Sequence, residues 1–103
     1  MTTTTDVLQF IQNFKFIYEH ELEYIFTQGN CYYFAVILNN KFNCDIYYMP
    51  IKNHFIAKIN NNFFDITGLV TIDEEPIKWS EYQIIDPVHA QRITRDCINF
   101  STR

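Results

Sequence analysis

The chain has 103 residues, of which 48% are hydrophobic, and its formal net charge is −4 at pH 7. This length is typical of a single domain, and the ten Phe and seven Tyr residues supply enough apolar volume for a core. The eight Lys and Arg residues are scattered singly, so no basic stripe indicates a nucleic-acid partner. No apolar run approaches the ~20 residues that span a bilayer, and the first six residues do not resemble a signal peptide. We therefore expect one cytoplasmic domain that binds neither nucleic acid nor a membrane.

The cysteines exclude two further kinds of site. Cys31, Cys44 and Cys97 make an odd count with no CxxC spacing. This pattern favours neither a disulfide framework nor a four-thiolate zinc site. We expect no metal and no cofactor, and each cysteine needs an explanation of its own.

The N-terminal third is predicted to be helical. Apolar residues recur at steps of three and four from about residue 6 to residue 26, which is the helical period, with Asp6 as the expected N-cap. This pattern fits one long helix or two helices with a break near Asn13. A second helix is expected from Cys31 to Leu38, capped by Asn30 and ended by Asn39 and Asn40. Because all its residues are apolar or aromatic, we expect it to be the buried central helix.

Strands are predicted next along the chain. Residues 45–49 are rich in β-formers and are followed by Pro50, and residues 54–59 and 63–68 resemble the two arms of a hairpin. A two-residue turn at Asn60 and Asn61 would place Ile59 opposite Asn62, because Asn tolerates the positive φ that such turns require. In that register one face is apolar, with Phe55, Ala57, Ile59, Phe64 and Ile66. The other face carries His54, Ile56, Lys58, Phe63, Asp65 and Thr67.

The hairpin register decides whether a histidine and a carboxylate can meet. With the two-residue turn, His54 is a diagonal neighbour of Asp65 on the same face, within reach of two side chains. A three-residue turn would put the two residues on opposite faces. Asp65 also lies between Phe64 and Ile66, so a buried carboxylate there needs a partner.

The C-terminal third completes the predicted fold. Residues 69–72 are compatible with a strand extension, residues 73–76 form an acidic turn, and residues 79–85 are ambiguous. Asp86 followed by Pro87 is typical of a helix start, so a closing helix is expected from Val88 to about Phe100. The order predicts an α+β fold: N-terminal helices, a central Cys-bearing helix on a small antiparallel sheet, and a C-terminal helix.

Cys31 has the position of a reactive thiol. It stands where a loop becomes a helix, and the N–H groups and dipole at a helix N-terminus stabilise a thiolate. A thiolate that attacks an acyl carbon needs a base and a group to orient that base, and His54 and Asp65 supply these. The Cys31 N–H and the Gln28 side chain are the expected oxyanion donors. The alternative for each residue alone is structural: a buried apolar Cys31 and a surface His54.

The segment Gln28-Gly29-Asn30-Cys31-Tyr32-Tyr33-Phe34-Ala35 resembles the nucleophile segment of papain-like cysteine peptidases, in which Gln-Gly precedes a Cys followed by aromatic and small residues. Residues 54–68 are similar to the His-strand-turn-strand-Asp element of transglutaminase-like, arylamine N-acetyltransferase-like and NlpC/P60-like proteins. This resemblance implies a minimal papain-like core, with Cys31 as nucleophile, His54 as general base and acid, and Asp65 as the orienting group. The chain departs from the peptidases at Ile25, where they carry the oxyanion glutamine.

Two functions from different classes follow as hypotheses. The first is a thiol-dependent acyl hydrolase or transferase of the peptidase or amidase type, which forms a thioester on Cys31. Its substrate would be a peptide or another amide or acyl compound, contacted by Asn30 and Tyr32. The second is a non-catalytic binding or inhibitor protein, for example phage-encoded, that keeps the fold and acts through contact with a protein target. The sequence leaves the oligomeric state open.

Overall fold

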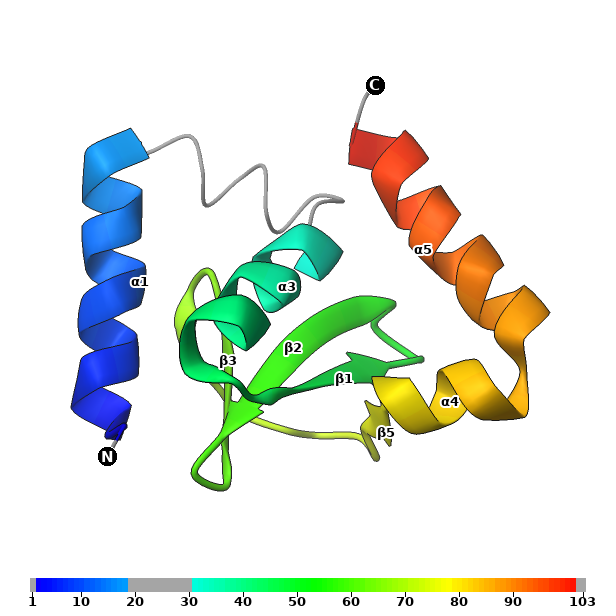
Figure 1. Cartoon of the computed structure of the whole chain (residues 1–103), viewed down its shortest axis with the longest axis horizontal. Coiled ribbons are helices and arrows are strands. Elements are labelled where there is room, and N and C mark those ends of the chain that lie inside the picture. Colours follow the sequence, from blue (N-terminus) through cyan, green and yellow to red (C-terminus); the bar gives the residue numbers. More distant parts are fainter. Residues whose placement is uncertain (1, 19–30, 102–103) are drawn as a thin grey trace.

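The computed structural model describes residues 2–18 and 31–101, and within these the chain is α+β, as predicted (Figure 1). The elements are α1 (Thr4–Tyr18), α3 (Cys31–Phe42), β1 (Asp45–Met49), β2 (His54–Ile59), β3 (Asn62–Asp65), β4 (Gly68–Val70), β5 (Ile77–Lys78), α4 (Trp79–Ile85) and α5 (Pro87–Ser101). The strands pair antiparallel in the order β4-β3-β2-β1-β5. No helix in the described ranges is long and apolar enough to cross a membrane.

Helix α1 begins with a capping box, which corrects the expected N-cap. The Thr3 N–H donates to the Asp6 carboxylate at 3.0 Å, and the Asp6 N–H donates to Thr3 Oγ1 at 3.1 Å. Thr3 is therefore the N-cap, and Asp6 is its reciprocal partner inside the helix. Helix α1 continues without a break through Asn13. The remainder of the predicted helix lies outside the described residues, as does the expected cap Asn30.

Helix α3 is longer than predicted. It runs to Phe42, so Asn39 and Asn40 lie within it rather than at its end. The helix ends where Asn43 adopts a left-handed conformation with φ of 52°. The Asn43 N–H donates to the Asn39 carbonyl at 2.9 Å, and the Asn39 side-chain amide donates to the Cys44 carbonyl. Asparagine at the C′ position is a known helix terminator, and here the helix ends four residues later than expected, at Phe42 instead of Leu38.

The β2-β3 hairpin has the predicted register. Ile59 pairs with Asn62 and Ala57 pairs with Phe64. The two turn residues, Asn60 and Asn61, have φ values of 52° and 66°, as a two-residue hairpin turn with positive φ requires. Residues 54 and 65 therefore share one face of the sheet.

The core lies between α3 and one face of the sheet. Helix α3 carries a stripe of four buried residues at helical spacing, namely Cys31, Phe34, Ala35 and Leu38. Phe34 and Leu38 belong to a cluster with Val7 and Ile11 of α1, and residues 57, 59, 64 and 66 of the sheet and the segment after it. The other two belong to a second cluster, with Tyr48, Phe55, Trp79 and Ala90. One helix therefore joins both halves of the core.

The C-terminal part differs most from expectation. The ambiguous residues 79–85 form helix α4, and the short strand β5 before them was not predicted. The predicted hairpin arm 63–68 is wrong beyond Asp65, where β3 ends. Residues 68–70 are not an extension of it but the separate strand β4, which pairs antiparallel with β3 and ends at Val70. Strands β4 and β5 lie at opposite edges of the sheet, so residues 71–76 must pass from one edge to the other (Figure 1). We call residues 71–76 the crossover segment. Helix α5 starts as predicted: the Asp86 carboxylate accepts the His89 N–H at 3.1 Å.

Candidate functional site

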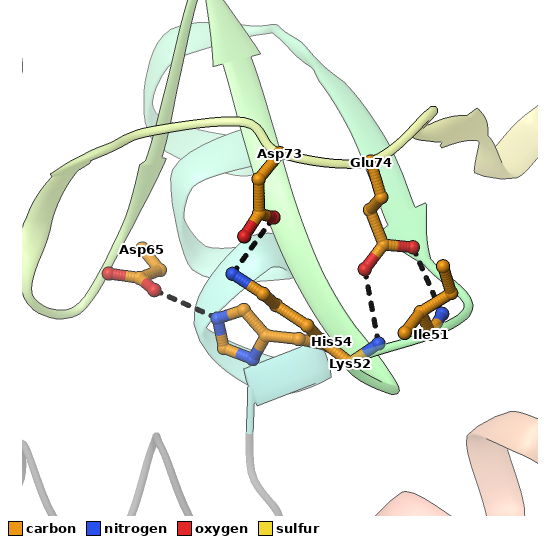
Figure 2. Close-up of polar contacts among 6 residues, drawn as sticks. All are labelled: Ile51, Lys52, His54, Asp65, Asp73 and Glu74. Atoms are coloured by element: carbon orange, nitrogen blue, oxygen red, sulfur yellow. Dashed lines mark hydrogen bonds and ion pairs between the residues drawn. The ribbon is translucent and has the colours of Figure 1, made fainter.

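His54 and Asp65 form a close polar pair, as the hairpin register predicts. His54 is the first residue of β2 and Asp65 is the last residue of β3. His54 Nε2 lies 2.8 Å from Asp65 Oδ2, and the two side chains are only 16% and 11% exposed (Figure 2). At this depth a charge-assisted hydrogen bond is screened little by water. His54 is therefore the partner that the Asp65 carboxylate needs in its apolar surroundings.

Thr67 completes the partners of Asp65. Its backbone N–H donates to Asp65 Oδ1 at 2.8 Å, and its hydroxyl donates to the same oxygen. Burial alone would raise the pKa of Asp65, but the hydrogen bonds from His54 and Thr67 outweigh it and hold that pKa below its ordinary value of 3.8. Asp65 is thus ionised at neutral pH, with one oxygen held by Thr67 and the other free to accept from His54. This role of Thr67 was not predicted, although its position two residues after an Asp is typical of an Asx turn.

This arrangement distinguishes the two ring nitrogens of His54. Because an ionised carboxylate only accepts hydrogen bonds, His54 Nε2 carries the proton that is shared with Asp65. In a neutral ring Nδ1 is then the atom with a free lone pair. In Figure 2, Nδ1 lies on the side of the ring away from Asp65.

Cys31 lies at the start of α3, as predicted. Its side chain is 6% exposed and packs in a cluster with Ala35, Phe55 and Trp79. Phe55 directly follows His54, and both views place the first turn of α3 beside the start of β2 (Figures 1 and 2). The structure thus brings the Cys31 and His54 segments to the same end of the helix-sheet packing. The positive end of the helix dipole lies at this point.

The other predicted site residues divide into two groups. Gln28 and Asn30 lie outside the described residues. Tyr32 is half-buried, with its ring edge-on to Phe55 at a centroid distance of 4.9 Å. Burial is the main cause that raises the pKa of Tyr32, and the neighbouring Tyr33 raises it further. In the described ranges, no three His, Cys, Asp or Glu side chains are grouped closely enough to hold a metal ion.

A scan against family models identifies the chain's relatives. The model for the phage YunG-like protein family matches residues 7–96, which is most of the chain. The chain belongs to the phage YunG-like family. The predicted membership of the papain-like superfamily is therefore wrong, because the family model that matches is a different one. No curated protein and no solved structure was found to match this YunG-like chain.

The error in the family prediction has a chemical origin. A Cys at a helix start, a His and an Asp are residue types that thiol chemistry requires on any scaffold, and such constellations recur on unrelated folds. The short stretches around Cys31 and between His54 and Gly68 carry that chemistry without identifying the family. The YunG-like match, by contrast, extends through the helices and strands on both sides of them.

Proposed function

We propose that this YunG-like protein uses Cys31, His54 and Asp65 as a site for thiol-based acyl hydrolysis or transfer. The observation that carries the proposal is the oriented His54–Asp65 pair at the start of β2, next to the first turn of α3. Histidine held by a carboxylate on one ring nitrogen is suited to exchange a proton at the other. Alternation along β2 directs His54 away from the sheet face on which Phe55 and Cys31 pack. The proposed reaction therefore requires the sulfur and the ring to meet around the end of the strand.

Each residue has one role in the proposed reaction. His54 Nδ1 takes the proton of the Cys31 thiol, and the helix dipole favours the thiolate that results. The sulfur adds to the acyl carbon, the bond from that carbon to the leaving nitrogen or oxygen breaks, and His54 returns the proton to the leaving group. Water, or another acceptor, then gives a proton to His54 and attacks the thioester, which releases the acyl product. The thiolate finally regains that proton. Asp65 keeps the ring oriented throughout.

Neighbouring groups complete the proposed site. The Cys31 backbone N–H, in the first turn of α3, is the first proposed oxyanion donor. The Gln28 side chain is the second proposed donor. Asn30 and Tyr32 contact the substrate, which is a peptide or another amide or acyl compound. The cytoplasm is the proposed compartment, because its reducing conditions keep Cys31 as a thiol.

Acyl transfer from an activated ester tests this proposal. The full chain is incubated with p-nitrophenyl acetate, and the acetylated residue is located by mass spectrometry after proteolysis. We expect acetyl groups on Cys31 in the wild type and a much lower yield in the His54→Ala variant, because the thiol then lacks its base. Cys44→Ser is the matched control and should change nothing. Equal acetylation of Cys31 with and without His54 would refute the proposed role of His54.

A second candidate is that the protein acts by binding a protein target. The family match supports this alternative more directly than it supports catalysis, because it indicates a small phage protein and names no reaction. A specific structural observation also favours it. Three aliphatic residues near the junction of α4 and α5 are largely exposed: Ile84 by 81%, Ile85 by 77% and Val88 by 66%. Adjacent exposed aliphatic side chains of this kind are typical of contact surfaces.

The two candidates are separated by a comparison of two variants. The wild type, Cys31→Ser and Ile85→Asp are each used to capture proteins from a bacterial lysate. A protein retained by the wild type and by Cys31→Ser, but not by Ile85→Asp, is the result expected if the α4-α5 corner binds a target. A protein lost only with Cys31→Ser would instead place recognition at the thiol site.

A further inference from the structure

The crossover segment is fastened to the turn that precedes His54. Glu74 Oε1 accepts the Ile51 backbone N–H at 2.9 Å, and Glu74 Oε2 accepts the Lys52 N–H at 3.1 Å (Figure 2). One carboxylate thus holds two consecutive amides of the turn between β1 and β2. Beside it, Lys52 Nζ lies 3.0 Å from Asp73 Oδ1. Residues 73 and 74 therefore contact the turn through three charge-assisted interactions.

The turn joins the ends of two paired strands. Residues 50–53 connect the paired residues Met49 and His54, and the register of β1 with β2 stops at that pair. Asn53 adopts a left-handed conformation with φ of 52°, and its side chain accepts a hydrogen bond from the Tyr48 hydroxyl. An isolated turn of this kind has several conformations of similar energy. A carboxylate that accepts two adjacent N–H groups selects one of them.

His54 is the first residue after this turn, so the backbone direction at the end of the turn determines the position of the His54 side chain. The Lys52–Asp73 pair is largely exposed, with side chains 47% and 61% accessible, and such pairs restrain little. The bidentate contact of Glu74 also lies at the surface, but it is the stronger restraint, since it fixes two backbone groups rather than one flexible side chain. Glu74 reaches the turn only because the crossover segment spans the sheet between its two edges.

We propose that Glu74 is a positioning residue, which fixes the β1-β2 turn and thereby holds the His54 ring in place for its partner groups. This inference rests on the proposed function, in which the placement of His54 governs the reactivity of Cys31. A carboxylate on the crossover segment, twenty residues after His54, therefore belongs to the site although it touches no reacting atom.

The test compares Glu74→Gln with Glu75→Gln in the full chain. Glutamine has nearly the same shape, but its NH₂ group faces one of the two N–H donors and cannot accept from it. Glu75 is exposed, so its substitution removes the same charge one residue away without removing this contact. Three readouts are used: hydrogen exchange at the Ile51 and Lys52 amides, the His54 ring resonances in NMR spectra, and the rate of Cys31 alkylation by iodoacetamide.

We expect Glu74→Gln to accelerate exchange at both amides, to shift the His54 ring resonances and to slow alkylation by about ten- to a hundredfold, because a misplacement of about 1 Å can cost a factor of about a hundred. Glu75→Gln should match the wild type in all three. Faster amide exchange with unchanged His54 resonances would overturn the positioning role, as would equal effects of both variants. If His54→Ala leaves alkylation unchanged, the proposed function fails, while the His54 resonances still decide whether Glu74 positions the ring.

Discussion

Asp65 is the residue whose interactions best explain the candidate site. Its place between two apolar residues indicates a partner from the sequence alone, and the hairpin register identifies that partner as His54. Two features were not predicted from the sequence: the two hydrogen bonds from Thr67 and the bidentate contact of Glu74. The Thr67 hydrogen bonds follow the Asx-turn spacing, which can be recognised in the sequence. The Glu74 contact has no local sequence signal, because it depends on where the crossover segment passes.

The lowered pKa of Asp65 predicts how stability varies with pH. A carboxyl whose pKa is lower in the folded state than in the unfolded chain stabilises the fold above the unfolded value, and this contribution is lost as the pH falls through the folded value. The wild type should therefore be more stable than Asp65→Asn at neutral pH, by about 1–3 kcal/mol. The difference should shrink as the pH drops below about 4. Urea unfolding of both proteins between neutral and strongly acid pH measures this, and a difference that is constant with pH would contradict it.

The Thr67 hydroxyl should contribute measurably to the same pair. Thr67→Val keeps the shape and the backbone N–H bond but removes the side-chain donor to a mostly buried carboxylate. We expect a loss of about 1.5–3 kcal/mol in the free energy of unfolding, the usual value for a hydrogen bond to a charged group. Thr67→Ser should recover most of it. Thr71→Val, at an exposed position, is the control. Equal stability of the Val and Ser variants at position 67 would show that the hydroxyl is unimportant.

At the scale of elements, the sequence predicted what local signals determine. Strand β1, the hairpin register and the start of α5 follow from β-propensity, an Asn-Asn turn and an Asp-Pro cap. The end of α3 was predicted too early, because Asn39 and Asn40 are weak helix breakers and the left-handed residue that ends the helix is Asn43. Strand β5 has only two residues, too few for any periodic pattern, and it forms because β1 offers a free edge.

The hairpin turn offers a test at this scale. Asn61 has a φ of 66°, which glycine adopts at no steric cost and a β-branched residue adopts only with strain. Asn61→Gly should leave the free energy of unfolding nearly unchanged, whereas Asn61→Val should lower it by about 1–2 kcal/mol. Thermal or urea unfolding of the two variants makes the comparison. Similar stability of both variants would mean that the turn does not hold this conformation.

For the whole molecule, the α+β class was predictable and the family was not. Helical and strand periods determine the class through the burial of apolar faces, and the structure confirms the central Cys-bearing helix on an antiparallel sheet. Family membership is a matter of the entire chain, and three residue types suited to one chemistry do not determine it. The arrangement of both core clusters around one helix was not predicted either, because it depends on where α1 and α5 pack.

Helix α3 should accordingly dominate global stability. Phe34 is 1% exposed and packs in the cluster that joins α3 to α1 and the sheet. Phe34→Ala should cost about 3–5 kcal/mol, which is a large share of the ~5–15 kcal/mol that stabilises a typical domain. Calorimetry or urea unfolding measures the loss. A cost below about 1 kcal/mol would show that α3 does not hold the core together.

The central claim is that His54 activates Cys31, and the pH dependence of iodoacetamide labelling tests it most directly. Cys44 is an internal reference, because burial is the main cause that raises its pKa to about 11 and leaves it nearly unreactive at neutral pH. We predict that Cys31 in the wild type is labelled well below the ordinary thiol pKa of about 8.5, and that His54→Ala moves its labelling profile to higher pH. A Cys31 profile that follows an ordinary thiol and does not change in His54→Ala would contradict the account.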